Sequence, residues 1–257
     1  MQFSDKVVYQ IYPKSFYDSN GDGLGDIRGI IEKLDYIKNL GVDYIWITPI
    51  YPSPMKDGGY DISDYCAIDP RFGTMADFNE LVKSAEEKDI SIMMDLVLCH
   101  TSDQHEWFQR AINGDENYQK YYILRDGRNK KSAEDSGEPP TNWQCAFGGS
   151  AWEYIPRLNK WYLHLHDVSQ PDLDWTNPKV REELANVVSF WKEKGVSGFR
   201  FDVINLISKP EIFEDDTKGL GRKLFADGVH VHEYLRELVK NSGIDGMITF
   251  GEMASTD

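Results

Sequence analysis

Short apolar runs alternate along this chain with longer amphipathic stretches, and this alternation restricts the possible folds more than any other feature of the sequence. The apolar runs indicate strands buried on both faces, at residues 7–11, 44–47, 90–98, 197–201 and 247–250. Between them, apolar residues recur with helical spacing at 30–40, 75–88, 178–194 and 230–239. Strands separated by helices predict a parallel sheet with helices packed on its faces.

The rhythm of strands and helices breaks between His100 and Asp167. This stretch is polar, contains several glycines and prolines, and carries four tryptophans, at positions 107, 143, 152 and 161. Disordered linkers are poor in aromatic residues, so we expect a small folded domain inserted at 101–167. The flanking segments, 1–100 and 168–257, then belong to the larger domain.

Five predicted strands leave two architectures open. A doubly wound sheet of five parallel strands tolerates open edges. A (β/α)8 barrel needs eight strands to close, so in that alternative the 257 residues contain only the first five. Strand and helix periodicity alone favours the doubly wound sheet.

Composition excludes several classes of partner. The chain has 43 acidic against 28 basic residues and a net charge of -15, which disfavours binding to nucleic acid. No segment approaches the roughly 20 apolar residues of a membrane span, and no signal peptide is recognisable at the N-terminus. The three cysteines are odd in number and widely spaced, as expected of reduced thiols in a cytoplasmic protein.

Polar side chains follow three of the predicted strands. Asp95 and His100 lie at the end of the third strand, Asp202 at the end of the fourth and Glu252 at the end of the fifth. A single such carboxylate is often only a helix cap. Three in series indicate a site at the carboxyl-terminal edge of the sheet.

The surroundings of two of these carboxyl groups predict different roles. Strand alternation places Arg200 and Asp202 on the same face, where the guanidinium is expected to keep the carboxylate ionised and oriented as a nucleophile. Glu252 follows an apolar run, which is expected to raise its pKa and suit it to proton donation. Two carboxyl groups in opposed environments are what glycoside hydrolysis requires.

The segments around these residues resemble the α-amylase superfamily. The similarity covers almost the whole chain and rests on residues 7–13, 57–61, 95–100, 170–174, 198–205 and 251–253. It implies a (β/α)8 TIM barrel present up to about the fifth strand, with a small domain inserted after the third. By this resemblance the remaining strands and a C-terminal β domain lie beyond residue 257.

The resemblance also implies roles for individual residues. Asp202 would be the nucleophile of a retaining α-glucosidase and Glu252 its general acid and base. The residues expected to contact the substrate are Asp57, Tyr60, His100, Phe147, Arg200 and Val203. Taken in isolation, Tyr60 reads equally well as a packing residue and His100 as a strand-end residue.

This chain departs from the family pattern in two places. Cys99 stands where the family usually carries Asn, and a thiol cannot replace the two donors and the acceptor of an amide. We therefore expect reduced local order beside His100. The family's third essential carboxylate lies beyond residue 257, so we expect the 257 residues to be inactive by themselves.

The segment from Asp18 to Asp26 places oxygen-bearing side chains at alternate positions between glycines. This pattern is typical of the first half of an EF-hand loop and resembles a calcium loop of the α-glucosidase branch. The expected Ca²⁺ ligands are Asp18, Asn20, Asp22, Asp26 and the carbonyl of Leu24. The alternative is an ordinary pair of Asn-Gly and Asp-Gly turns.

The prediction of the preferred substrate rests on short segments of the sequence. Val203, directly after the predicted nucleophile, resembles enzymes acting on α-1,6 linkages and on trehalose 6-phosphate. Residues 166–170 and 251–256 resemble trehalose-6-phosphate hydrolases more than oligo-1,6-glucosidases, the alternative. A phosphorylated substrate needs nearby cations, for which Lys209, Arg222 and Lys223 are the candidates.

A non-catalytic relative is the alternative from another class. The superfamily includes membrane-anchored ancillary subunits of amino-acid transporters, which usually lack the catalytic carboxylates. This chain retains Asp202 and Glu252, and we therefore expect a hydrolase.

Overall fold

A five-stranded parallel sheet forms the centre of the computed structural model, which describes residues 5–254. Its strands, in spatial order, are β1 (Val8–Ile11), β2 (Tyr44–Ile47), β3 (Ser91–Leu96), β7 (Gly198–Phe201) and β8 (Ile248–Gly251). All four neighbouring pairs are parallel, which confirms the predicted sheet. Positions 1–4 and 255–257, which include two residues used above to compare substrates, lie outside the described residues.

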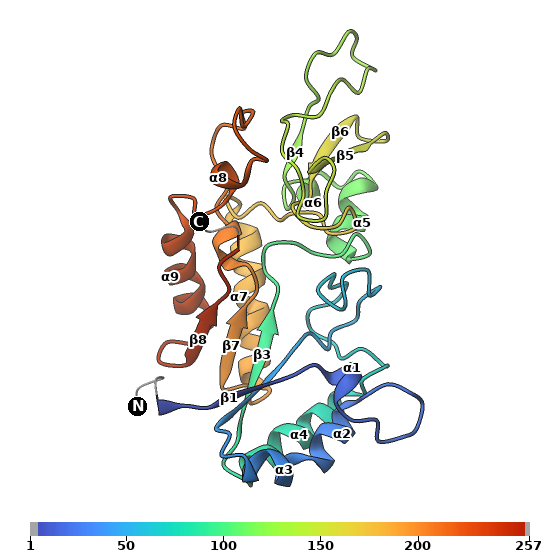
Figure 1. Cartoon of the computed structure of the whole chain (residues 1–257). Coiled ribbons are helices and arrows are strands. Elements are labelled where there is room, and N and C mark those ends of the chain that lie inside the picture. Colours follow the sequence, from blue (N-terminus) through green and yellow to red (C-terminus); the bar gives the residue numbers. More distant parts are fainter. Residues whose placement is uncertain (1–4, 255–257) are drawn as a thin grey trace.

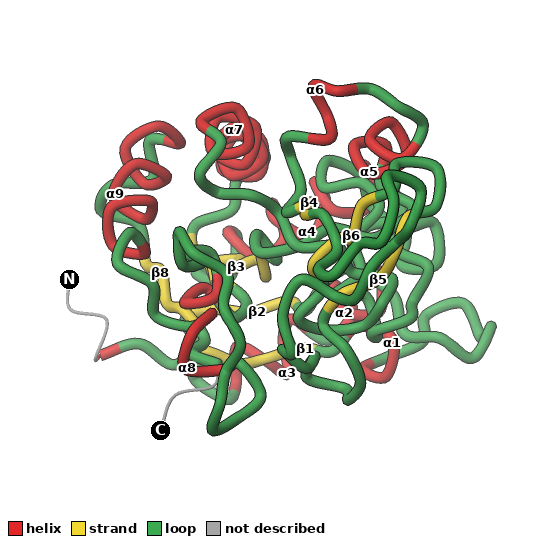
Figure 2. The backbone as a smooth tube through the Cα atoms, turned by 90° about the horizontal axis from the view of Figure 1, so that it is seen from above, coloured by secondary structure: helices red, strands yellow, loops and turns green. Residues whose placement is uncertain are grey.

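Helices pack against the sheet between successive strands. The principal ones are α2 (Ile27–Glu32), α3 (Leu34–Asn39), α4 (Met75–Glu86), α7 (Pro178–Glu193) and α9 (Val231–Ser242). Seen from above, α7 and α9 lie side by side along one side of the sheet (Figure 2). The single helix expected at 30–40 is two helices, because the backbone of Lys33 leaves helical geometry and bonds three residues back, to Ile30.

Sequence signals at the helix starts are visible in the structure. Thr74 and Asp77 form a reciprocal capping box at the start of α4. Asn177 caps the start of α7, where Pro178 occupies the first turn and needs no hydrogen-bond acceptor for its nitrogen. These capping interactions fix the residue at which each helix begins.

A second, antiparallel sheet lies above the carboxyl ends of the large sheet (Figure 1). It has the order β4 (Leu124–Arg125), β6 (Lys160–Leu163) and β5 (Trp152–Ile155), and it follows α5 (Glu106–Ile112) and α6 (Glu116–Gln119). All of these elements fall within the predicted insertion, whose limits at 101 and 167 stay a prediction. The short elements α1 (Pro13–Phe16), the 3-10 turn η2 (Ile204–Leu206) and α8 (Arg222–Phe225) complete the described structure.

Large aromatic side chains hold the end of β3 in position. Trp175 is fully buried and donates its indole N–H to the carbonyl of Leu98 at 2.8 Å. The hydroxyl of Tyr51 donates to the carbonyl of Asp95 at 2.8 Å, and that of Tyr65 to the carbonyl of His100 at 2.7 Å. Each buried ring combines apolar packing with a satisfied polar group, so the strand end has little freedom to move.

No helix within residues 5–254 has the length and apolar character needed to cross a membrane.

Candidate active site

The register of the central strands brings an acid and a base side by side. Asp95 on β3 pairs with Arg200 on β7, which in turn pairs with Phe250 on β8. Nη1 of Arg200 donates to Asp95 Oδ1 at 2.7 Å and to Asp202 Oδ1 at 2.6 Å, while Nη2 donates to Glu252 Oε2. One guanidinium thus gathers three carboxyl groups, and the predicted same-face placement of Arg200 and Asp202 fits this contact.

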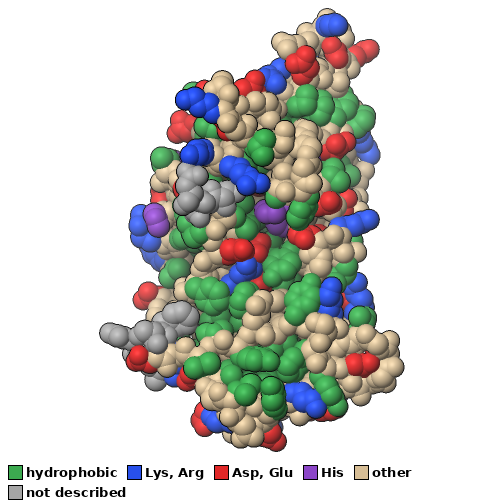
Figure 3. Space-filling model, viewed as in Figure 1, with side chains coloured by type: hydrophobic (Ala, Val, Ile, Leu, Met, Phe, Trp, Pro, Cys, Tyr) green, Lys and Arg blue, Asp and Glu red, His purple; other side chains and the backbone are tan. Residues whose placement is uncertain are grey.

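We call Asp95, Arg200, Asp202 and Glu252 the Arg200 cluster. It lies at the carboxyl ends of three adjacent parallel strands, the edge where barrel enzymes hold their catalytic groups. On the face drawn in Figure 3, acidic, basic and histidine side chains gather midway up the molecule.

Asp95 is expected at this edge from the sequence, but no catalytic or substrate-binding role was predicted for it. It lies inside β3 rather than after it, is fully buried, and accepts hydrogen bonds from Trp46 Nε1 at 3.1 Å and the Tyr60 hydroxyl at 3.2 Å. The signal for it was present, because an acid within the apolar run Met93–Leu96 needs partners to be buried. Trp46 carried no comparable signal.

Burial and mutual repulsion control the ionisation of Asp95 and Asp202. Burial raises the pKa of Asp95 to about 6, with Arg200 opposing the shift. Burial and then the charge of Asp95 raise the pKa of Asp202 to about 8, again opposed by Arg200. Two nearby carboxylates resist joint ionisation, so each of these groups disfavours the charged form of the other. Arg200 therefore holds Asp202 in place, but it does not by itself keep it ionised as predicted.

The expectation of an apolar environment for Glu252 is wrong for the described structure. Its side chain is 47% exposed and contacts the Arg200 guanidinium. The physical reason is its position, since Glu252 follows β8, an edge strand with a neighbouring strand on one side only.

The predicted sugar-binding residues are joined by a chain of hydrogen bonds. Gln170 Nε2 lies 2.9 Å from Asp57 Oδ2 and 3.0 Å from His100 Nε2. His100 Nε2 also lies 3.1 Å from the carbonyl of Tyr60, whose hydroxyl reaches Asp95. Burial raises the pKa of Asp57 and lowers that of His100. Asp57, Tyr60 and His100 are therefore brought together, with Gln170 as a linking residue that the predicted site lacked.

The two other predicted contact residues are placed differently. Phe147 is 61% exposed, with its ring centroid 6.3 Å from that of His166. Val203 is buried, and its φ of 35° is left-handed, which is unfavourable for a β-branched residue. Backbone bonds on either side hold it, from Asp202 N to Leu96 O and from Ile204 N to Glu252 O. The strained turn therefore fixes Asp202 relative to Glu252.

The thiol at position 99 takes part in the polar network. Cys99 Sγ lies 3.0 Å from Nδ1 of His100, and both residues are buried. The thiol thus makes one of the polar contacts that an amide would make, and the reduced local order expected beside His100 stays a prediction.

The three predicted phosphate-binding residues separate into two groups. Lys209 is buried and forms an ion pair of 2.8 Å with the buried carboxylate of Asp172, so its charge is already neutralised. Arg222 and Lys223 are exposed in α8, near the carboxyl ends of the sheet strands (Figure 1). Of the three predicted residues, Lys209 is therefore the least suited to contact a phosphate.

The predicted calcium loop is a series of tight turns. A side-chain oxygen of Asp18, Asn20 and Asp22 each accepts the backbone N–H two residues later, at 2.8 to 3.2 Å. Asp26 caps α2 through Gly29 N. Within residues 5–254, the carboxylates of Asp18, Asp22 and Asp26 are not among the groups of three ligand atoms that lie within 4.8 Å of one another. Calcium binding by these residues and Leu24 stays a prediction.

Comparison with known proteins places this geometry among characterised enzymes. Residues 10–257 match the family described as alpha amylase, catalytic domain. Trehalose-6-phosphate hydrolase of Bacillus subtilis (strain 168) is 51% identical over 253 residues, covering 97% of this chain and 44% of that protein. Oligo-1,6-glucosidase of Bacillus cereus is 49% identical over 259 residues, covering 98% of this chain and 45% of that protein.

A solved structure agrees closely with the described fold. The crystal structure of Bacillus licheniformis trehalose-6-phosphate hydrolase has 52% sequence identity and a TM-score of 0.93, covering 98% of this chain and 45% of that one. This chain thus spans 44% to 45% of the length of these relatives.

Proposed function

This chain belongs to the α-amylase family, and from that premise we propose that a protein containing it hydrolyses α-glucosides with retention of anomeric configuration. Its five-stranded sheet is part of the (β/α)8 barrel of that family and not a complete doubly wound sheet. Because the chain spans 44% of the length of its Bacillus subtilis relative, the activity is proposed for the whole protein. Inactivity of residues 1–257 by themselves stays a prediction.

The Arg200 cluster is the observation that supports this function. Asp202 contacts Nη1 and Glu252 contacts Nη2 of the same guanidinium. Two carboxyl groups bridged in this way fit the short separation of retaining glycosidases, about 5 to 5.5 Å, better than the wider gap of inverting ones.

The proposed mechanism has two steps. In the first, Glu252 donates a proton to the glycosidic oxygen while Asp202 attacks the anomeric carbon, forming a glycosyl-enzyme ester and releasing the leaving sugar. In the second, Glu252 accepts a proton from water, which displaces Asp202 and releases glucose. Arg200 contacts both carboxyl groups and so positions one relative to the other.

Trehalose 6-phosphate is the proposed substrate, yielding glucose and glucose 6-phosphate. The similar identities to trehalose-6-phosphate hydrolases and oligo-1,6-glucosidases do not separate the two, so isomaltose and related α-1,6 oligosaccharides are the alternative. The exposed cations of α8 support a phosphorylated substrate, because phosphate recognition needs local positive charge on a chain that is acidic overall.

Release of glucose from the two substrates tests this choice. We expect the protein to release glucose from trehalose 6-phosphate at least about tenfold faster than from isomaltose, a transition-state preference of about 1.4 kcal/mol. Faster release from isomaltose would contradict the assignment of trehalose 6-phosphate as the substrate, while the reaction would remain hydrolysis of an α-glucoside. Release from neither by the whole protein would contradict the proposed function.

The phosphate assignment is tested by Arg222→Ala. It should raise KM for trehalose 6-phosphate about tenfold through loss of a charge-assisted contact, while KM for isomaltose is unchanged. Equal effects on both substrates, or none on either, would remove Arg222 from phosphate recognition.

We propose that the loop from Asp18 to Asp26 binds a structural Ca²⁺. Side-chain oxygens at alternate positions and the absence of basic residues within the loop support this assignment. Added Ca²⁺ should raise the Tm of the protein by a few degrees, as expected for a ligand that binds only the folded state. Asp22→Asn should abolish the shift and Asp89→Asn, an exposed control, should keep it; an equal shift in both would refute the site.

We also propose a cytoplasmic location. The support is that Cys66, Cys99 and Cys145 all remain free thiols in the folded chain. Mass spectrometry of thiols alkylated during lysis should find all three reduced in cells.

A further inference from the structure

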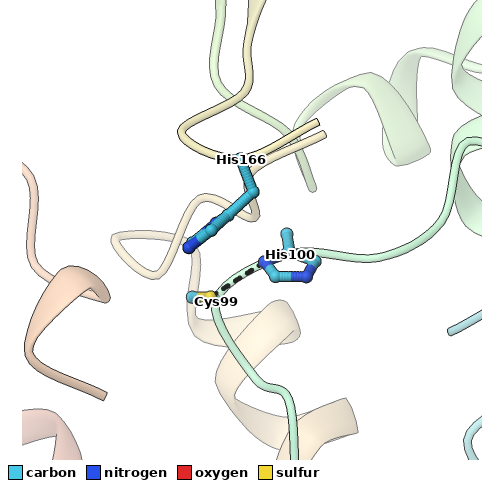
Figure 4. A group of neighbouring side chains, drawn as sticks. All are labelled: Cys99, His100 and His166. Atoms are coloured by element: carbon cyan, nitrogen blue, oxygen red, sulfur yellow. Dashed lines mark hydrogen bonds between the residues drawn. The ribbon is translucent and has the colours of Figure 1, made fainter. Parts of the chain in front are cut away.

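Three potential metal ligands converge next to the sugar-binding residues. Cys99, His100 and His166 each offer one ligand atom, and these atoms lie within 4.8 Å of one another. Among the described residues this is the only such group of His, Cys, Asp or Glu side chains. Figure 4 shows the His166 ring reaching toward Cys99 and His100 from a separate segment.

The hydrogen bonds of His100 leave one ring nitrogen available to a metal. Its Nε2 faces the carbonyl of Tyr60 at 3.1 Å, which can only accept. Gln170 Nε2 lies 3.0 Å from the same ring nitrogen and carries two protons, one of which it donates to Asp57. In the proposed metal-bound form the ring proton of His100 lies on Nε2, where the Tyr60 carbonyl accepts it. Nδ1 then has its lone pair toward Cys99, and a histidine whose second nitrogen donates to a carbonyl is the usual form of a metal ligand.

His166 supplies an observation that the polar network does not explain. Its Nδ1 is buried and has no hydrogen-bond partner, and it is one of two such atoms found among the described side chains. Leaving a buried ring nitrogen without a hydrogen bond is unfavourable, so the polar groups around His166 are incomplete without a further partner.

We propose that Cys99, His100 and His166 bind a soft divalent cation such as Zn²⁺, and that the bound ion blocks the sugar pocket. On binding, the cation replaces the thiol proton of Cys99, which leaves to solvent, and a thiolate–metal bond forms. Bond lengths of about 2.3 Å to sulfur and 2.0–2.1 Å to nitrogen place these ligands about 3.6 Å apart in a tetrahedral site. The present separation of 3.0 Å between Cys99 and His100 needs to open by only about half an ångström.

The charged groups that act on the Cys99 thiol are the carboxylates of Asp172 and Asp202 and the ammonium group of Lys209. Asp172 is paired with Lys209 at 2.8 Å and Asp202 with Arg200 at 2.6 Å, so the thiolate of Cys99 supplies the negative charge that faces the bound ion. Three protein ligands leave a fourth position for water, as in open zinc sites.

Cobalt titration of the full chain tests the site without any substrate. We expect one Co²⁺ per chain, with a thiolate-to-cobalt charge-transfer band in the near ultraviolet. Cys99→Ser should abolish this band, whereas Cys66→Ser and Cys145→Ser should keep it; circular dichroism and Tm show whether each variant folds. His166→Gln should weaken binding at least about tenfold, because it removes one of three ligands.

Absence of the band in the unmodified protein, or its persistence in Cys99→Ser, would overturn the proposal. The blocking effect rests on the proposed function, and there Zn²⁺ should raise KM in the unmodified protein and not in Cys99→Ser. A protein that binds cobalt through Cys99 but hydrolyses no α-glucoside would keep the metal site and remove the function. Hydrolysis that Zn²⁺ leaves unchanged would overturn the blocking role.

Discussion

The centre and the edge of the large sheet hold the same chemical group in different states. Asp202 follows β7, an interior strand with a neighbour on each side, and is buried, with its pKa raised to about 8. Glu252 follows β8, the edge strand of the described sheet, and its side chain is 47% exposed. Both contact Arg200. The difference shows that strand position, more than the nearest neighbour in sequence, determines how a carboxyl group at this rim is solvated.

Substituting Asp202 and Glu252 one at a time should give the largest effects on activity. Asp202→Asn should lower kcat about 10⁴-fold or more, because the nucleophile is lost. Glu252→Gln should lower it about 10²- to 10⁴-fold, the usual contribution of a general acid and base. Steady-state rates of glucose release measure both, and an Asp202→Asn protein with near-normal kcat would break the assignment.

Arg200→Gln should cost about 3–5 kcal/mol of unfolding free energy at pH 8. The substitution leaves the buried carboxyl groups of Asp95 and Asp202 without their counter-charge, and an unpaired buried charge strongly destabilises the fold. Lys179→Gln is the matched control, since its pair with Glu182 is exposed to solvent and should contribute little to stability. Urea unfolding measures both variants. Equal losses of unfolding free energy would show that the Arg200 cluster contributes no more than an exposed ion pair.

The stability of the protein should depend on pH through the buried carboxyl group of Asp202. A raised pKa means that the folded state holds a proton that the unfolded state has released, so Asp202 costs stability as pH rises from about 4 to about 8. Asp202→Asn should therefore unfold at higher urea than the unmodified protein, by a few kcal/mol at pH 8 and by little at pH 4. Comparing the two proteins at each pH cancels the opposite effect of His100 and His105, whose lowered pKa values destabilise the fold in acid.

A stability difference between the two proteins that is the same at pH 4 and pH 8 would contradict the raised pKa of Asp202.

The smallest expected effect lies outside the Arg200 cluster. Phe147→Ala should raise KM about threefold with kcat unchanged, since an exposed ring far from the reacting atoms contributes equally to binding of the substrate and of the transition state. Initial rates over a range of substrate concentrations measure this, and a fall in kcat would place Phe147 closer to the reacting atoms than the structure does.

Much of the large sheet followed from periodicity alone. The strand at 44–47 was predicted with the limits of β2, because a run of four apolar residues is flanked by polar ones. The helix at 30–40 was predicted without its break, since nothing in the local sequence distinguishes Lys33 from a residue within a helix. The (β/α)8 assignment needed the family motifs, because five parallel strands fit two architectures.

The site was predictable where it depends on neighbours along one strand and not where it depends on the order of strands. Arg200 and Asp202 share a face because they are two residues apart. The exposure of Glu252 depends on β8 being an edge, and the approach of His166 to Cys99 joins segments far apart in the chain. Such contacts follow from tertiary packing, which periodicity does not encode.

Trapping the glycosyl-enzyme tests the central claim most directly. The whole protein would be treated with a fluorinated α-glucosyl fluoride that forms the covalent intermediate quickly and releases it slowly, and then digested for mass spectrometry. We predict one added sugar per chain, on the carboxyl group of Asp202. A label on Glu252 or elsewhere, or continued hydrolysis with no label, would contradict the assignment of Asp202 as the nucleophile held by Arg200.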